Sequence, residues 1–172
     1  MVDGQYIDSP NKHWRYTLNI LPAGRPLNIY YGSKIGTVMF DGPVSIPTLY
    51  EGNSDNKFYR ETPWMSLTPM EIITLRGGIR RAKGRVVVAG LGLGYQLTEI
   101  IRKKTVKEVV LIERDQSLVD WILPTIQRNF PSKPLQVIIG DVYKELPKLT
   151  ADVAVVDVFK AYGNNDYEIN DL

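Results

Sequence analysis

The chain contains no cysteine and only one histidine, His13, among its 172 residues. Without cysteine there is no disulfide bond, no thiol nucleophile and no thiolate metal site. With one histidine, a serine–histidine–aspartate triad would have to use His13, and a metal site built from several histidines is impossible. Carboxylates could still hold magnesium, but nothing in the spacing of the acidic residues demands it, so we assign no metal site to the chain.

The chain also has little excess of either charge sign and no long hydrophobic run. The net charge is +2, from 21 basic and 19 acidic residues, which is too small to imply a polyanionic partner. Two short basic stretches, residues 76–85 and 102–107, fit solvated helix ends better than a nucleic-acid contact. No segment reaches membrane-spanning length, and the first residues lack a basic segment followed by an apolar one. We expect a soluble, cytoplasmic protein without a membrane partner, and nucleic acid is not expected.

The two parts of the sequence follow different patterns, although 44% hydrophobic residues allow a core throughout. Residues 1–57 hold short alternating segments, at 14–20, 27–31, 37–40 and 44–50, which predict a small antiparallel β meander. In residues 58–172, apolar runs at 85–89, 108–112, 135–139 and 152–156 alternate with helical patterns. Strands that alternate with helices predict an α/β fold, a Rossmann-like doubly wound parallel sheet with right-handed crossovers.

A glycine-rich turn follows the first of these buried strands. Gly90, Gly92 and Gly94 stand at alternate positions directly after the apolar run 86–89. Side chains at those positions would keep a ligand away from the main chain, so the turn predicts a binding site. The second apolar run ends in Glu113, where a doubly wound sheet places a carboxylate that holds ribose hydroxyls. The sequence therefore predicts a protein that binds a nucleoside cofactor.

The spacing of the glycines disfavours a dinucleotide. Nicotinamide and flavin folds use G-x-G-x-x-G, but the third place is Tyr95 counted from Gly90 and Leu97 counted from Gly92. The Gly-Lys-Ser/Thr ending of a phosphate-binding loop is absent as well. The pattern suits a ligand without pyrophosphate, whose amino-acid and sulfonium part crosses the bare turn.

Because of these residues, the segment 58–165 resembles the class I S-adenosylmethionine-dependent methyltransferases and their relatives, the spermidine synthases. The resemblance implies that the glycine turn lies under the methionine part of S-adenosylmethionine and that Glu113 holds its ribose. It further implies that Asp141, after the third strand, approaches the adenine amine. Asp157, at the end of the fourth strand, would face the reacting centre and orient or deprotonate the acceptor.

The resemblance to spermidine synthases extends towards the N-terminus. Those enzymes carry an antiparallel N-terminal sheet and a Tyr-x-Glu segment, matched here by Tyr59 and Glu61, which the resemblance implies as substrate-binding residues. Their glycine turn normally includes an aspartate where this chain has Leu93, and the acidic residue that follows Asp157 in their fourth strand is missing. A methyltransferase acting on an unidentified acceptor is therefore the first interpretation. The alternatives are an aminopropyl transferase and a non-catalytic protein that keeps the cofactor fold.

The resemblance also implies a shortened sheet. Methyltransferase sheets have seven strands, and this chain supplies four, in the expected order 3-2-1-4. The fourth strand would then form an apolar edge, which is a pairing hazard. We expect the N-terminal strands, residues 158–172 or a second subunit to cover it, and we favour a homodimer.

Overall fold

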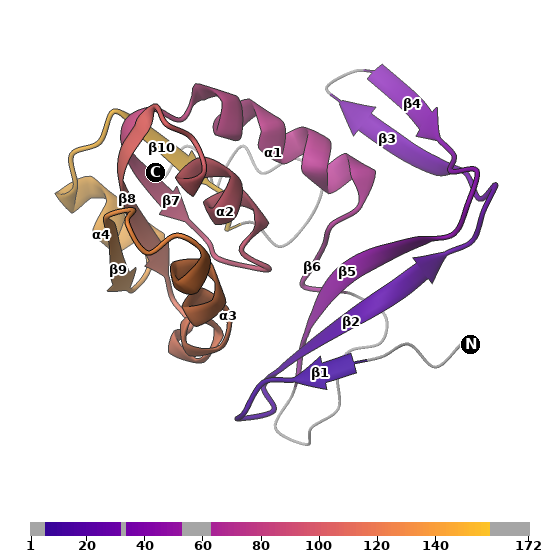
Figure 1. The fold of residues 1–172 in the computed structure, drawn as a ribbon, viewed down its shortest axis with the longest axis horizontal. Helices are drawn as coiled ribbons and strands as arrows, with labels where there is room; N and C mark the ends of the chain where they lie inside the picture. Colours follow the sequence, from indigo (N-terminus) through magenta and orange to yellow (C-terminus); the bar gives the residue numbers. More distant parts are fainter. Residues whose placement is uncertain (1–5, 32–33, 53–62, 159–172) are drawn as a thin grey trace. The chain divides into compact units, whose positions relative to one another are not determined.

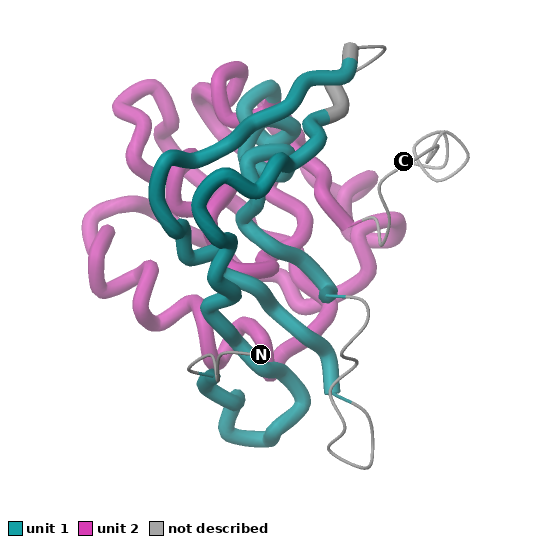
Figure 2. Tube along the Cα trace, turned by 90° about the vertical axis from the view of Figure 1, so that its right-hand side faces the viewer, with its two compact units in different colours: residues 1–77 teal, residues 78–172 magenta. Residues whose placement is uncertain are grey.

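The computed structural model describes residues 6–31, 34–52 and 63–158. The chain divides into two compact units, residues 1–77 and residues 78–172 (Figure 2). The domain boundary expected from the sequence, between residues 57 and 58, lies outside the described residues and stays a prediction.

The first unit contains an antiparallel sheet, as expected. Its strands are β1 (Tyr6–Asp8), β2 (Trp14–Leu21), β5 (Val44–Glu51) and β6 (Met65–Ser66), in the order β1-β2-β5-β6. Inward-facing residues of β2 and β5 form its core: Trp14 is 2% exposed and Leu49 is fully buried. The edge of the Trp14 ring also contacts Trp64, with 5.6 Å between the ring centroids.

Strands β3 (Leu27–Tyr31) and β4 (Lys34–Val38) form a separate two-stranded hairpin, so β2 pairs with β5 instead of its neighbour in sequence. The hairpin closes at its base, where the N–H of Gly24 donates to the carbonyl of Phe40 at 2.9 Å. Gly24 adopts a left-handed φ of 69°, which a turn residue with a side chain rarely does. The strand expected at 37–40 ends at Val38 because Phe40 takes part in this closure.

The second unit has the expected parallel sheet (Figure 1). Its strands are β7 (Gly84–Ala89), β8 (Val106–Glu113), β9 (Leu135–Ile139) and β10 (Val153–Val156), in the order β10-β7-β8-β9. This is the order 3-2-1-4 read from the other side, and all pairings are parallel. The connecting elements are helix α2 (Tyr95–Ile101), helix α3 (Gln116–Asn129), helix α4 (Val142–Glu145) and the 3-10 turn η1 (Leu146–Lys148).

Both faces of this sheet are covered, which explains the uninterrupted apolar runs of its central strands. Residues 86–89 and 109–112 are at most 1% exposed. On one face Val87 and Val110 pack with Val142 of α4. Because side chains alternate along a strand, the intervening residues of β7 and β8 face the opposite side of the sheet.

Helix α1 (Pro69–Arg81) precedes the sheet and is capped by Thr68. The hydroxyl of Thr68 accepts the N–H of Glu71 at 3.3 Å. The helix contains Gly77 and Gly78, two residues of low helix propensity, and nevertheless continues to Arg81. Gly78 serves close packing, because a Cβ there would lie 2.5 Å from Cγ1 of Val155 in β10.

Strand β10 is the end strand of the sheet among the described residues, so its pairing with a second subunit stays a prediction. No helix within residues 6–31, 34–52 and 63–158 is long and apolar enough to cross a membrane.

Candidate functional site

The predicted site residues follow the carboxyl ends of the four parallel strands. Ala89 of β7 pairs with Ile112 of β8 on one side and Val156 of β10 on the other. Main-chain bonds continue beyond the strands: the N–H of Asp157 donates to the carbonyl of Ala89 at 2.9 Å, and that of Gly140 donates to the carbonyl of Glu113 at 3.0 Å. The fold therefore brings Gly90, Glu113, Asp141 and Asp157 to one edge of the sheet, called the carboxyl edge below.

The three glycines of the turn all have left-handed backbones, and two of them lie against other parts of the chain. The φ angles of Gly90, Gly92 and Gly94 are 93°, 49° and 75°. A Cβ on Gly90 would overlap the carbonyl oxygen of Asp157, and one on Gly94 would lie 2.6 Å from Cδ1 of Ile126 in α3. Gly90 and Gly94 are thus required by the packing of the chain itself, which the sequence did not reveal.

Most of the turn's N–H groups that point inward are already used by the chain. The N–H of Gly90 donates to Ile112 at 2.9 Å, and that of Gly94 donates to Leu91 at 2.8 Å, in both cases to the carbonyl oxygen. The N–H of Leu91 donates to Oε2 of Glu113 at 2.8 Å. A phosphate-binding loop needs such groups aimed at its ligand, so this turn is poorly suited to a pyrophosphate.

Glu113 fixes the turn as well as standing at the predicted ribose position. Its side chain is 9% exposed, and its second oxygen, Oε1, accepts the N–H of Asp115 at 3.0 Å. Asp115 in turn caps α3 by accepting the N–H groups of Ser117 and Leu118. A carboxylate has about four acceptor positions, and these two bonds leave positions that ribose hydroxyls could use. The role of Glu113 towards the turn is the functional contact that the sequence missed.

Asp141 lies at the carboxyl edge, where it caps α4. Its Oδ1 accepts the N–H of Tyr143 at 3.0 Å, with an extended backbone typical of a capping residue. The resemblance implied a contact of Asp141 to adenine. The cap is present, and the contact to adenine stays a prediction.

Asp157 stands beside the glycine turn at the end of β10. The residue keeps solvent-accessible surface, yet the surrounding protein removes enough water from the carboxyl that desolvation raises its pKa above the ordinary 3.8. A raised pKa suits a group that exchanges a proton near neutral pH. Tyr59 and Glu61, the two predicted substrate-binding residues, lie outside the described residues.

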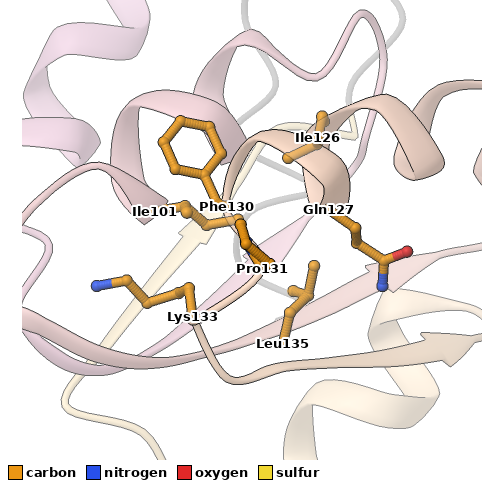
Figure 3. A pocket seen from close by; sticks show the side chains of 7 residues that line it. All are labelled: Ile101, Ile126, Gln127, Phe130, Pro131, Lys133 and Leu135. Carbon is orange, nitrogen blue, oxygen red and sulfur yellow. The ribbon is translucent and has the colours of Figure 1, made fainter.

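A small pocket lies at the opposite edge of the same sheet, called the amino edge below, where the strands begin (Figure 3). Its volume is about 120 Å³. It is enclosed by the last residue of α2, the last turn of α3 and the segment that enters β9. Its lining consists of Ile101, Ile126, Gln127, Phe130, Pro131, Lys133 and Leu135. None of the site residues predicted from the sequence is among the lining residues of this pocket.

The chain matches no protein-family model and no curated protein. Among solved structures, it is similar to the spermidine synthase of Thermotoga maritima, with a TM-score of 0.46 and 13% identity over 83% of this chain and 56% of that chain. A protein-L-isoaspartate O-methyltransferase gives a TM-score of 0.42 and 21% identity over 59% of this chain and 32% of that chain.

The precorrin 8W decarboxylase of Methanobacterium thermoautotrophicum gives a TM-score of 0.44 and 24% identity over 60% of this chain and 53% of that chain. The chain thus spans about half, or less, of the length of these proteins. Spermidine synthase and methyltransferase are the two families that the sequence resembles. Identities below 25% concern the fold alone, so function has to be argued from the residues of this chain.

Proposed function

We propose that the carboxyl edge of the parallel sheet binds S-adenosylmethionine, and that the chain belongs to a transferase that moves the methyl group to an acceptor. The observation that carries this proposal is the left-handed turn 90–94, whose N–H groups at Gly90, Leu91 and Gly94 are satisfied within the chain. At Gly92 such a turn leaves the main chain without a side chain, and it offers no anion site.

The position of the turn supports a ligand at this edge. In open α/β sheets, ligands bind outside the carboxyl ends of the strands, where the strand order reverses. Here the order reverses at β7, because β8 and β9 follow on one side of it and β10 lies on the other. The glycine turn follows β7 and Asp157 follows β10, so both lie next to the point where the strand order reverses.

The used N–H groups separate this cofactor from a dinucleotide. A pyrophosphate is bound largely by free main-chain N–H groups at the start of a helix. Three of the turn's N–H groups are unavailable for that purpose, and one of them is bound by a carboxylate that would repel a phosphate. An adenosyl sulfonium carries a positive charge at its reactive centre, which suits an edge bearing Glu113, Asp141 and Asp157.

The chemistry divides between cofactor and chain. S-adenosylmethionine supplies a methyl group on a sulfonium, and transfer is a direct displacement that depends mainly on the alignment of donor and acceptor. In this proposal Glu113 holds the ribose hydroxyls, and Asp141 accepts from the adenine amine. Asp157 orients the acceptor and takes its proton, for which its raised pKa is suited. Tyr59 and Glu61 would contact the acceptor.

A non-catalytic role is the second candidate, because specific contacts favour it. Gly90, Gly94 and Glu113 all have structural tasks in the packing of the edge. Those tasks would preserve part of the motif in a protein that binds no cofactor. An aminopropyl transferase, which uses the decarboxylated cofactor, is the third possibility and would share the same edge.

Titration calorimetry with S-adenosylmethionine, S-adenosylhomocysteine and decarboxylated S-adenosylmethionine distinguishes the three functions. Binding of the first two supports the methyltransferase. A preference for the decarboxylated compound supports aminopropyl transfer, and the absence of binding by all three overturns the cofactor site.

Gly92→Asn tests the turn directly. Asparagine tolerates a left-handed backbone better than other residues with a side chain, so the fold should survive while the ligand's path is filled. We expect a loss of affinity of about tenfold or more, equivalent to about 1.4 kcal/mol. Gly24→Asn is the matched control, because Gly24 also has a left-handed φ, 69°, and open space around it. Equal affinity in both variants would show that the turn is only architectural.

A further inference from the structure

The amino edge of the parallel sheet is rich in basic residues, and it also holds the acidic residues Asp152 and Glu108. Three of the segments that enter a strand bring a cation: Lys83 precedes β7, Lys104 precedes β8 and Lys133 precedes β9. The sequence placed these cations in separate short stretches, and the parallel topology collects them at one edge.

Hydrogen bonds show that three of these segments are immediate neighbours. The ammonium group of Lys103 donates to the carbonyls of Ile79 and Arg80, at 2.6 and 2.8 Å. The ammonium group of Lys133 donates to the carbonyls of Lys103 and Val106, at 3.1 and 2.7 Å. The end of α1, the turn between α2 and β8, and the turn between α3 and β9 therefore form one continuous surface.

These two lysines already satisfy the exposed carbonyls, so the remaining cations exceed what the helix ends require. Basic residues near the last turn of a helix usually stabilise its free carbonyls. Lys103 does so at the end of α1, whereas Lys133 donates to the carbonyl of Lys103, just after α2, and to that of Val106, the first residue of β8. The other exposed cations of this edge form no ion pair with a carboxylate of residues 6–31, 34–52 and 63–158: Arg80, Lys83, Lys104, Lys107 and Arg128.

The small pocket opens within this basic surface. Figure 3 shows Phe130, Pro131 and Leu135 around it, with the Gln127 amide on one side and Lys133 on the other. The guanidinium of Arg102 stands 6.0 Å from the centroid of the Phe130 ring. A hollow with an aromatic wall and one amide at its rim can take a flat heteroaromatic ring, which the amide can bond at its edge.

We propose that the amino edge binds single-stranded nucleic acid, with phosphates on the exposed cations and one unstacked base in the pocket lined by Phe130 and Gln127. Cations without carboxylate partners provide the sequence-independent attraction to phosphates. A base reaches an aromatic wall only when it has left its stack, so a single strand is favoured over a duplex. This inference goes beyond the proposed transferase function and does not depend on it.

The expectation from the sequence was that the basic stretches are solvated helix ends and that nucleic acid is not a partner. The same experiment decides between the two readings. Fluorescence anisotropy with a labelled single strand of about 12 nucleotides, a length within the span of single-strand-binding folds, measures the affinity at several salt concentrations. We expect stronger binding of the strand than of its duplex, and a linear fall of log affinity with log salt.

Lys104→Glu and Lys144→Glu form the matched pair. Both lysines are exposed and both changes alter the net charge equally, but Lys144 lies in α4, close to the carboxyl edge. Lys104→Glu should lower the affinity about fivefold and reduce the salt slope by about 0.7, the contribution of one single-strand phosphate contact. Lys144→Glu should leave both unchanged.

Phe130→Leu tests the pocket, because leucine keeps an apolar wall and preserves the fold. It should lower the affinity about fivefold, the lower end of what one base stacked on an aromatic ring contributes, without changing the salt slope. Equal affinities of the two lysine variants would overturn the proposal. So would a preference for the duplex or for phosphatidylserine vesicles, or a dissociation constant above about 0.1 mM, the weak limit of non-specific binding at physiological salt.

Discussion

Replacement of Glu113 by glutamine tests how the carboxyl edge is held together. The two carboxylate oxygens of Glu113 each accept one main-chain N–H, from Leu91 at 2.8 Å and from Asp115 at 3.0 Å. Glutamine has nearly the same shape but only one oxygen, and its NH₂ group is a donor. In either orientation of the amide, one of the two N–H groups faces another donor.

The expected cost follows from these bonds. A hydrogen bond to a charged group contributes about 1.5–3 kcal/mol, and a buried donor without an acceptor costs about 1–3 kcal/mol. These figures overlap, since the lost bond creates the unsatisfied donor, and a neutral amide is easier to bury than a carboxylate. We therefore expect Glu113→Gln to lower the free energy of unfolding by about 2–3 kcal/mol. For a chain of this size the midpoint temperature should fall by about 5–10 °C.

Thermal unfolding followed by circular dichroism measures the loss, and amide hydrogen exchange at Leu91 and Asp115 locates it. Glu108→Gln is the control, because Glu108 meets Arg85 in a half-exposed ion pair at 3.3 Å and accepts no main-chain N–H in the described residues. That variant should lose less than about 1 kcal/mol. If Glu113→Gln is as stable as the control, or if exchange at both amides is unchanged, Glu113 does not hold the turn.

Two further predictions concern the same edge. Gly90→Ala should lower the free energy of unfolding in urea by more than about 2 kcal/mol, because the new methyl group overlaps the carbonyl of Asp157 and φ is 93°. Gly36→Ala is the control and should cost little, because Gly36 has open space around it. Equal urea midpoints of the two variants would refute the packing role of Gly90. Burial raises the pKa of Asp157, so the folded state binds its proton more tightly, and this residue's contribution to stability should fall as the pH rises from its ordinary pKa of 3.8 through the raised value. Asp157→Asn should remove that fall, and urea midpoints across this pH range that stay parallel to wild type would contradict the expected titration.

Much of the fold follows from the sequence because buried parallel strands leave strong local signals. The runs 86–89 and 109–112 are apolar throughout, since both of their faces are covered, and Thr68 with Glu71 marks the start of α1. The pairing of β2 with β5 was less accessible. It depends on the closure of the hairpin between Gly24 and Phe40, a contact between residues far apart in the sequence.

The candidate site was predictable in position but not in its internal contacts. The carboxyl ends of parallel strands meet at one edge, so Glu113, Asp141 and Asp157 could be placed together from the order of strands alone. Which groups their oxygens bind depends on the exact path of each turn. The bond between Glu113 and Leu91 joins two strand ends, and no local pattern encodes it. The amino edge was missed for a related reason, because its cations belong to separate segments of the sequence.

The close packing around Gly90 and Gly94 has a consequence for how such glycine motifs are recognised. A related protein that bound no ligand would still need glycine at residue 90, beside Asp157, and at residue 94, beside Ile126. Atoms of the chain itself lie where a methyl group would be placed. Two of the three glycines of the turn would therefore be retained for packing alone. Glycine at residues 90 and 94 is therefore weak evidence of binding in a protein of this fold, and a test of binding has to change Gly92, which is proposed to face the ligand.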